Sequence, residues 1–126
     1  MDLLGRKRFL FGAWNAPAND EKFYRWLRGS GIDLLMLMGN YVGVPNTPAY
    51  DRAFELCEAH GVHTLVDVSH TYPISFPAGY PEKDCFLGFL VKDEPVGADF
   101  AMLREQIARY QEAYPDALLF INLFPS

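Results

Sequence analysis

Five short apolar runs alternate with helical stretches along most of the chain, and this alternation limits the folds open to it. Each run is too short for an ordinary helix and is typical of a buried strand. The runs cover residues 8–14, 32–38, 62–68, 85–92 and 117–124. The stretches between them with helical character cover residues 21–28, 48–60 and 99–114. Strands that alternate with helices predict a parallel sheet with right-handed crossovers.

Residues 71–84 interrupt this rhythm. The segment contains three prolines, Pro73, Pro77 and Pro81, and shows no helical spacing of its apolar residues. Because proline disrupts a helix interior, we expect a loop where the third helix would stand. The predicted order is therefore two strand–helix units, a strand with a long loop, a strand–helix unit and a last strand.

The length of 126 residues indicates a single domain, residues 1–126. Five parallel strands suit either a complete doubly wound sheet or just over half of an eight-stranded barrel, which takes about 250 residues. A nucleotide-binding doubly wound sheet has a glycine-rich turn after its first strand, whereas Asn15-Ala16-Pro17 stands there in this chain. We therefore predict an α/β fold with a parallel sheet, namely a partial (β/α)8 TIM barrel.

The charge balance argues against two classes of partner. The formal net charge is -5, and the only basic cluster is Arg6-Lys7-Arg8 at the amino terminus. We therefore expect no nucleic acid and no anionic membrane as the main partner. No apolar run approaches the roughly 20 residues of a spanning helix, and no signal peptide is recognisable. The cellular compartment stays open.

The two cysteines, Cys57 and Cys85, fall in a predicted helix and near a predicted strand start. Their spacing fits neither a metal site nor a disulfide framework, so we expect buried free thiols. His60 and His63 flank a helix-to-strand turn and are expected to be structural.

Polar and aromatic side chains follow the predicted strands. The carboxyl ends of parallel strands lie at one edge of a sheet, where sites form. Amides suit polar groups of a substrate and flat rings suit its apolar faces. Turn chemistry explains each asparagine equally well, and core or loop packing is the more common role for any one aromatic residue. The candidate substrate-binding residues are Trp14, Asn15, Asn40, Asp67, His70, Asp93 and Asn122, with Tyr41, Tyr72 and Phe124 as further aromatic candidates.

Glu94 is the first candidate for catalysis. The run at 85–92 ends abruptly in Asp93, Glu94 and Pro95. A carboxyl group placed at a strand end can give and take a proton. The same two acids would also complement the positive amino end of the helix that follows. The residue pattern alone favours neither interpretation.

A metal site is a further interpretation. Asp67 and His70, with Glu94 from the next strand, suit a divalent metal of the kind that sugar isomerase barrels use. Alternation along a strand places Asp67 and His70 on opposite faces, unless the strand has already ended. We assign no metal ligand and expect no cofactor, and a metal-dependent isomerase or lyase stays an alternative.

Three segments resemble one group of proteins. They are Phe11-Gly12-Ala13-Trp14, the run from Gly88 to Pro95, and Ile121-Asn122-Leu123-Phe124-Pro125. They are similar to the amino-terminal half of clan A glycoside hydrolase barrels, and most similar to the beta-galactosidase-like branch. The resemblance covers nearly the whole chain. Asp-Glu-Pro alone is a weak motif, but it is distinctive between a glycine-aromatic strand and a later Asn-Leu-Phe-Pro strand end.

The resemblance implies a role for Glu94. In that clan the acid/base glutamate ends strand four, which Glu94 matches, and the nucleophilic carboxylate ends strand seven. The sequence reaches five strands, so we expect a truncated or partial relative. The clan often has asparagine directly before the acid/base residue, whereas this chain has Asp93, so the usual contact to a sugar hydroxyl is not implied.

The implied function is carbohydrate-directed hydrolysis of O-glycosidic bonds, with Glu94 as general acid/base and without a nucleophile in this chain. The metal-dependent sugar isomerase or lyase is one alternative. The other is a non-catalytic half-barrel that assembles with itself or another chain, because an open sheet leaves two edges with unpaired backbone groups.

Overall fold

A computed structural model of the chain describes residues 10–38, 42–70 and 79–123. These residues form a five-stranded sheet in which all neighbouring strands are parallel. Its order, β1-β2-β3-β4-β5, is the order along the chain. A doubly wound sheet instead reverses direction at a switch point. The curled sheet is therefore part of an α/β barrel, as the sequence predicts. The strands are β1 (Gly12–Ala13), β2 (Leu34–Leu37), β3 (His63–Asp67), β4 (Phe86–Asp93) and β5 (Leu118–Asn122).

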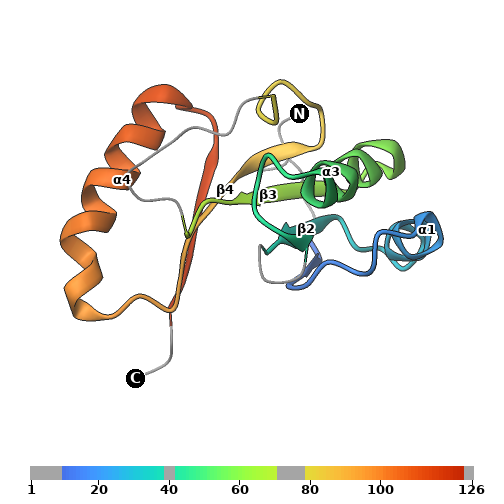
Figure 1. Cartoon of the computed structure of the whole chain (residues 1–126), viewed down its shortest axis with the longest axis horizontal. Helices are drawn as coiled ribbons and strands as arrows, with labels where there is room; N and C mark the ends of the chain where they lie inside the picture. Colours follow the sequence, from blue (N-terminus) through green and yellow to red (C-terminus); the bar gives the residue numbers. More distant parts are fainter. Residues whose placement is uncertain (1–9, 39–41, 71–78, 124–126) are drawn as a thin grey trace.

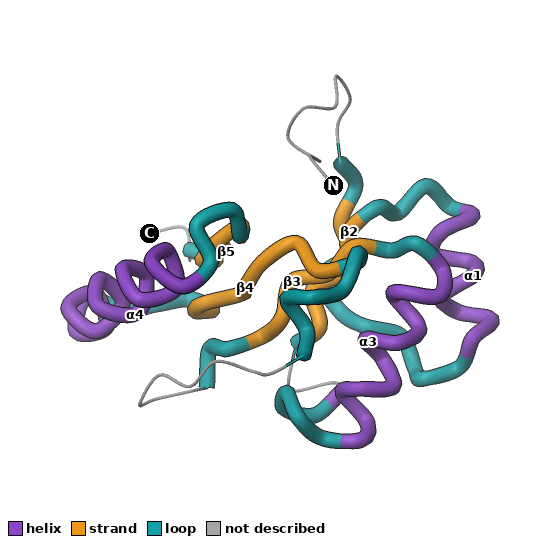
Figure 2. The backbone as a smooth tube through the Cα atoms, turned by 90° about the horizontal axis from the view of Figure 1, so that it is seen from above, coloured by secondary structure: helices purple, strands orange, loops and turns teal. Residues whose placement is uncertain are grey.

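The helices lie in two groups beside the sheet. Helices α1 (Glu21–Gly29) and α3 (Pro48–His60) pack together near β2 and β3, whereas α4 (Phe100–Ala113) lies beside β4 and β5 (Figures 1 and 2). A 3-10 turn, η1 (Gly97–Asp99), leads into α4. No helix in the described part of the chain is long and apolar enough to cross a membrane.

The predicted elements are confirmed to within a few residues, apart from the short first strand. Asp20 caps α1 by accepting a hydrogen bond from the Lys22 N–H at 3.0 Å. Gly61 ends α3 in the left-handed conformation, with φ of 65°. The described part of the proline-rich segment, residues 79–84, contains turns and no helix. Residues 8, 9 and 124 of the predicted strands lie outside the described residues.

The main core lies between the sheet and its helices. Tyr24, Tyr50, Phe89 and Tyr110 are fully buried there. The Phe89 ring lies 4.6 Å from the Tyr110 ring, centroid to centroid, and this contact joins β4 to α4. Aromatic burial of this kind supplies a large part of the hydrophobic stabilisation of a small domain.

A second, smaller cluster covers the inner face of the curled sheet. Met38, Leu65 and Leu90 are buried in it. The Trp14 and Phe120 rings lie 6.2 Å apart although they come from opposite ends of the strand order. The sheet is therefore curved enough for side chains from its two ends to meet, as in a barrel interior filled by side chains.

Residues 32–38 are nearly all apolar, which is typical of a strand covered on both faces, but β2 is not buried equally on its two faces. Leu35 and Leu37 are buried on the helix-covered face, whereas Leu34 and Met36 on the inner face are half-buried. In the described sheet β2 lies next to the edge strand β1, which has only two residues. All five residues of β3, at the centre of the sheet, are buried.

Strand β4 carries two register shifts. Relative to β3 the pairing moves on from Thr64–Phe86 to Leu65–Gly88, so Leu87 is an extra residue. Relative to β5 it moves from Leu90–Phe120 to Lys92–Ile121. Such bulges re-aim the side chains that follow them. Without the second shift, Lys92 would stand opposite Asn122, where Asp93 now pairs.

Both cysteines are buried free thiols, as predicted. Burial raises the pKa of the Cys57 thiol to about 12. Burial also raises the pKa of the Cys85 thiol, and a hydrogen bond to the Glu58 carboxylate adds to this effect. The two thiols therefore stay protonated near neutral pH and have little nucleophilic character.

Strands β4 and β5 approach each other closely at Gly88, and this close approach leads to a stability prediction. A Cβ atom at Gly88 would lie 1.9 Å from the carbonyl oxygen of Leu118. We expect Gly88→Ala to lower the free energy of unfolding by about 3 kcal/mol or more, because the strands must separate. Denaturant unfolding followed by circular dichroism measures this.

The matched control is Gly29→Ala in α1, where a Cβ atom meets nothing within 4 Å. This change should raise the free energy of unfolding by about 0.5–1 kcal/mol, because alanine favours the helix. A Gly88→Ala protein as stable as the Gly29→Ala protein would contradict the close strand approach.

Candidate functional site

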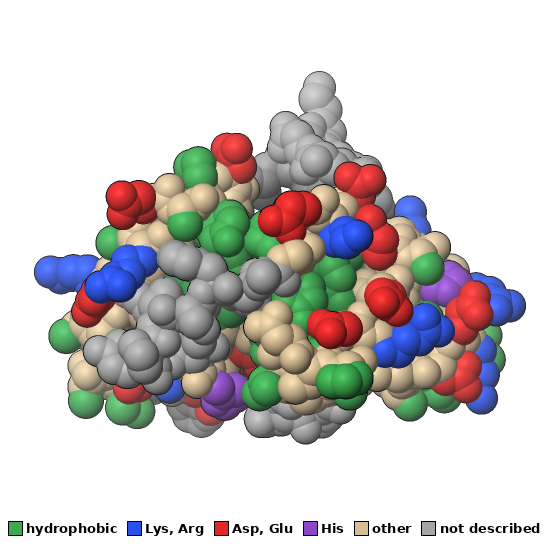
Figure 3. Space-filling view, turned by 45° about the horizontal axis from the view of Figure 1, so that its top comes forward, with side chains coloured by type: hydrophobic (Ala, Val, Ile, Leu, Met, Phe, Trp, Pro, Cys, Tyr) green, Lys and Arg blue, Asp and Glu red, His purple; other side chains and the backbone are tan. Residues whose placement is uncertain are grey.

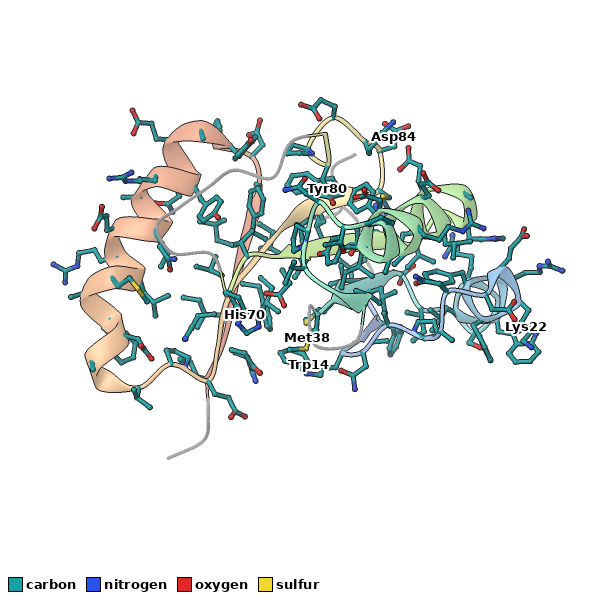
Figure 4. All side chains as sticks on the ribbon, viewed as in Figure 1. Trp14, Lys22, Met38, His70, Tyr80 and Asp84 are labelled. Carbon is teal, nitrogen blue, oxygen red and sulfur yellow. The ribbon has the colours of Figure 1, made fainter. Side chains whose placement is uncertain are left out.

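The candidate site lies at the carboxyl ends of the strands. Trp14, Met38 and His70 gather at this edge in Figure 4, each from the end of a different strand. Met38 and His70 line a small cavity of about 60 Å³ together with Ser69, Lys92 and Asp93. Residues from the ends of β2, β3 and β4 therefore converge, as the sequence predicts for a parallel sheet.

Asp67 ends β3 and is 3% exposed. Its carboxylate accepts hydrogen bonds from the Ser69 N–H at 2.9 Å and the Ser69 hydroxyl at 2.6 Å. The Asp67 N–H donates to the Tyr50 hydroxyl at 2.9 Å, and this hydroxyl donates to the Leu37 carbonyl at 3.0 Å. Tyr50 thus bridges the ends of β2 and β3. The hydrogen bonds from Ser69 to the Asp67 carboxylate thus shape the turn that leads to His70.

Asp93 and Asn122 are brought together. They are register partners on β4 and β5, and the Asn122 amide donates to the Asp93 carboxylate at 2.9 Å. Asp93 is half-buried and lines the small cavity with the exposed side chain of His70. A carboxylate held by an amide donor is a fixed acceptor, suited to a sugar hydroxyl or a water molecule.

Glu94 follows β4 with an exposed side chain. Its backbone N–H donates to the Asn122 carbonyl at 2.8 Å. No hydrogen bond or ion pair joins the Glu94 carboxylate to another of the described side chains. Its φ of 46° lies in the left-handed region, which non-glycine residues rarely occupy. A strained residue beside a candidate site is a reason to suspect function.

The helix that follows does not depend on these two acids. Asp99 accepts a hydrogen bond from the Val96 N–H at 2.8 Å at the start of η1. The amino end of this helical segment therefore has its own carboxylate. This observation weakens the interpretation in which Asp93 and Glu94 serve only to complement the helix dipole.

The remaining predicted residues are placed as follows. Trp14 is half-buried against Phe120, and Asn15 beside it is exposed. Asn40, Tyr41, Tyr72 and Phe124 lie outside the described residues. His60 and His63 lie at the opposite, amino-terminal edge, where the His63 N–H donates to the Asp33 carbonyl at 2.9 Å.

The described residues contain no group of three or more histidine, cysteine, aspartate or glutamate side chains that would hold a metal ion. The Asp67 carboxylate is bonded to Ser69, whereas His70 lines the small cavity together with Asp93. The metal-dependent isomerase or lyase gains no support from this part of the chain.

Sequence reasoning missed three residues at this edge. Tyr50 bridges two strand ends, although its place in a helix predicts a core residue. Lys92 and Ser69 line the cavity. Ser69 had a detectable signal, since Asp-x-Ser after a strand is typical of a turn closed by the aspartate side chain. The sequence carries no comparable signal for Lys92, because the orientation of its side chain depends on the register shift in β4.

Comparison with protein-family models finds no match for this sequence, and a search of curated proteins finds no similar sequence.

The left-handed backbone of Glu94 generates a prediction. We expect Glu94→Gly to raise the free energy of unfolding by about 0.5–1 kcal/mol, because relief of the strained φ exceeds the added flexibility of the unfolded chain. Thermal or denaturant unfolding measures the change.

Glu112→Gly is the control, because Glu112 is an exposed glutamate in α4. That change should lower the free energy of unfolding by about 1 kcal/mol. If both variants lose stability equally, the Glu94 backbone is not strained.

Proposed function

We propose that the chain belongs to a carbohydrate-directed barrel related to clan A glycoside hydrolases, in which Glu94 is the general acid/base for cleavage of an O-glycosidic bond. The observation that supports this best is the tip of β4. There Asp93 is held by Asn122, while the Glu94 carboxylate is exposed and unbonded within the described residues.

The two acids suit different tasks. General acid catalysis needs a carboxyl group that is free to transfer its proton to the leaving oxygen. Glu94 meets this condition. Asp93 is fixed as an acceptor by the Asn122 amide and suits a sugar hydroxyl. Trp14, half-buried at the same edge, offers a face for stacking on a sugar ring.

Retaining hydrolysis also needs a second carboxylate about 5 Å from the first. In the family that this chain resembles, the second carboxylate ends strand seven, and the described sheet has five strands. We therefore propose that this chain binds sugars by itself and cleaves them only when another polypeptide segment supplies the nucleophile.

Sugar binding tests the proposal directly. We expect lactose, cellobiose or maltose, titrated into the ¹⁵N-labelled chain at millimolar concentrations, to shift the NMR signals of the Trp14 indole and the Asn122 amide. Trp14→Ala should weaken binding about tenfold, because the stacking face is lost. Glu94→Gln should leave binding nearly unchanged, since its role is proton transfer.

Trp26→Ala is the matched control. Trp26 is 61% exposed on α1 and contacts the Phe23 ring, outside the strand-end cavity. Binding of none of the three sugars, or equal weakening by both tryptophan variants, would contradict the proposed site. Turnover of an aryl glycoside that Glu94→Gln abolishes would show that the chain already contains a complete catalytic pair.

A specific surface also favours the second candidate function, a half-barrel that assembles with another chain. Helix α4 and β5 line a groove of about 450 Å³ that includes Phe100, Ile107 and Ile121. Phe100 is 53% exposed. Every residue of β5 is half-buried, and β5 is an edge strand of the described sheet. Figure 3 also shows hydrophobic side chains exposed between acidic ones.

Sedimentation velocity at increasing concentration tests this second function. If the groove and the β5 edge bind another copy, the chain should associate, and Ala108→Glu in the groove should weaken association at least about tenfold by burying a charge. Ala101→Glu is the control, because Ala101 is exposed on α4 but does not line the groove. A monomer at all concentrations would contradict self-assembly.

A further inference from the structure

Asn122 bonds to both acids at the tip of β4. Its side-chain amide donates to the Asp93 carboxylate at 2.9 Å. Its backbone carbonyl accepts the Glu94 N–H at 2.8 Å. One residue of β5 therefore holds Asp93 through its side chain and Glu94 through the backbone.

This arrangement depends on the register shift in β4. Leu90 and Lys92 of β4 are two residues apart, whereas their partners on β5, Phe120 and Ile121, are adjacent. This extra residue in β4 brings Asp93 opposite Asn122. In an unshifted ladder Lys92 would stand opposite Asn122, and its ammonium group only donates hydrogen bonds. The amide would then have no carboxylate to bind. The register shift thus places Asp93 opposite Asn122, and the Asn122 amide holds the Asp93 carboxylate.

The two acids differ as a result. The Asp93 carboxylate has a fixed donor and lines the small cavity. The Glu94 carboxylate is exposed, and its backbone is held at a φ of 46°. Since this conformation is costly for glutamate, the hydrogen bond from its N–H helps to maintain it.

We infer that Asn122 is a positioning residue that gives these neighbouring acids separate roles. Its amide holds Asp93 as a fixed acceptor, and its place in the ladder fixes the backbone turn that presents Glu94 for proton transfer. This inference rests on the proposed function, and it removes Asn122 from the residues that contact sugar directly.

Two variants of Asn122 test the inference. Asn122→Leu keeps the size of the side chain and removes the amide. Asn122→Asp is isosteric and replaces the donor with an acceptor beside Asp93. Both variants keep the Asn122 carbonyl, but without the bond from the amide to Asp93 the ends of β4 and β5 should separate more often. We therefore expect hydrogen exchange of the Glu94 amide to accelerate at least about tenfold and lactose binding to weaken by a similar factor. A side chain that only filled space would tolerate the isosteric change.

NMR signals of the Asn122 side-chain amide give an independent readout. In the unchanged protein the hydrogen bond to Asp93 should slow hydrogen exchange of the Asn122 side-chain amide, and Asp93→Ala should accelerate this exchange at least about tenfold. Asn19→Leu is the matched control, because the Asn19 amide also makes a 2.9 Å hydrogen bond, to the Ala49 carbonyl, on an exposed surface. It should leave Glu94 exchange and lactose binding unchanged.

The outcomes separate the two proposals. If the unchanged protein binds no lactose, cellobiose or maltose, the proposed function fails, while hydrogen exchange of the Glu94 amide and of the Asn122 side-chain amide still decides the positioning role. If sugar binds and both Asn122 variants match the unchanged protein in exchange and affinity, the positioning role is overturned. Should Asn122→Leu not fold, the isosteric Asn122→Asp decides.

Discussion

The close approach of β4 and β5 at Gly88 is the constraint on which the candidate site depends. A side chain there would collide with the Leu118 carbonyl, so only glycine lets the two strands pair in this register. The pairing then shifts by one residue between Leu90 and Lys92, and this shift brings Asp93 opposite Asn122. The close approach at Gly88 and the register shift together determine which acid is held and which is free. Gly88 also belongs to the segment that carries the family resemblance.

Much of the fold could be predicted from the sequence, because its signals are local. Pro48 after Thr47 and Gly61 at the other end bound α3 where the sequence places it. Apolar runs between such helices predict parallel strands, and the missing glycine-rich turn after the first strand favours a barrel. The strand order confirms that choice. The side of β2 that stays half-buried was not predictable, because a run of leucine and methionine reads the same whether one face or both are covered.

The sequence predicts at which edge of the sheet the candidate site lies, but not which of its side chains are bonded to one another. Strand ends identify Asp67, Asp93 and Asn122, yet the sequence does not show that Asp67 is bonded to Ser69 while Asp93 is bonded to Asn122. Those differences come from the register shift in β4 and from the Tyr50 bridge, and both are long-range effects. An apolar run carries the same periodicity signal with or without an extra residue. The left-handed backbone of Glu94 is likewise invisible in the sequence.

We propose that the carboxyl edge of this partial barrel binds a sugar with its glycosidic oxygen beside Glu94. A crystal structure of the Glu94→Gln chain with a bound disaccharide would test this proposal. We expect a sugar ring stacked on Trp14, a hydroxyl bonded to Asp93, and the side chain at position 94 within hydrogen-bond distance of the bridging oxygen. A disaccharide bound at the amino-terminal edge, or in the groove between α4 and β5, would contradict it.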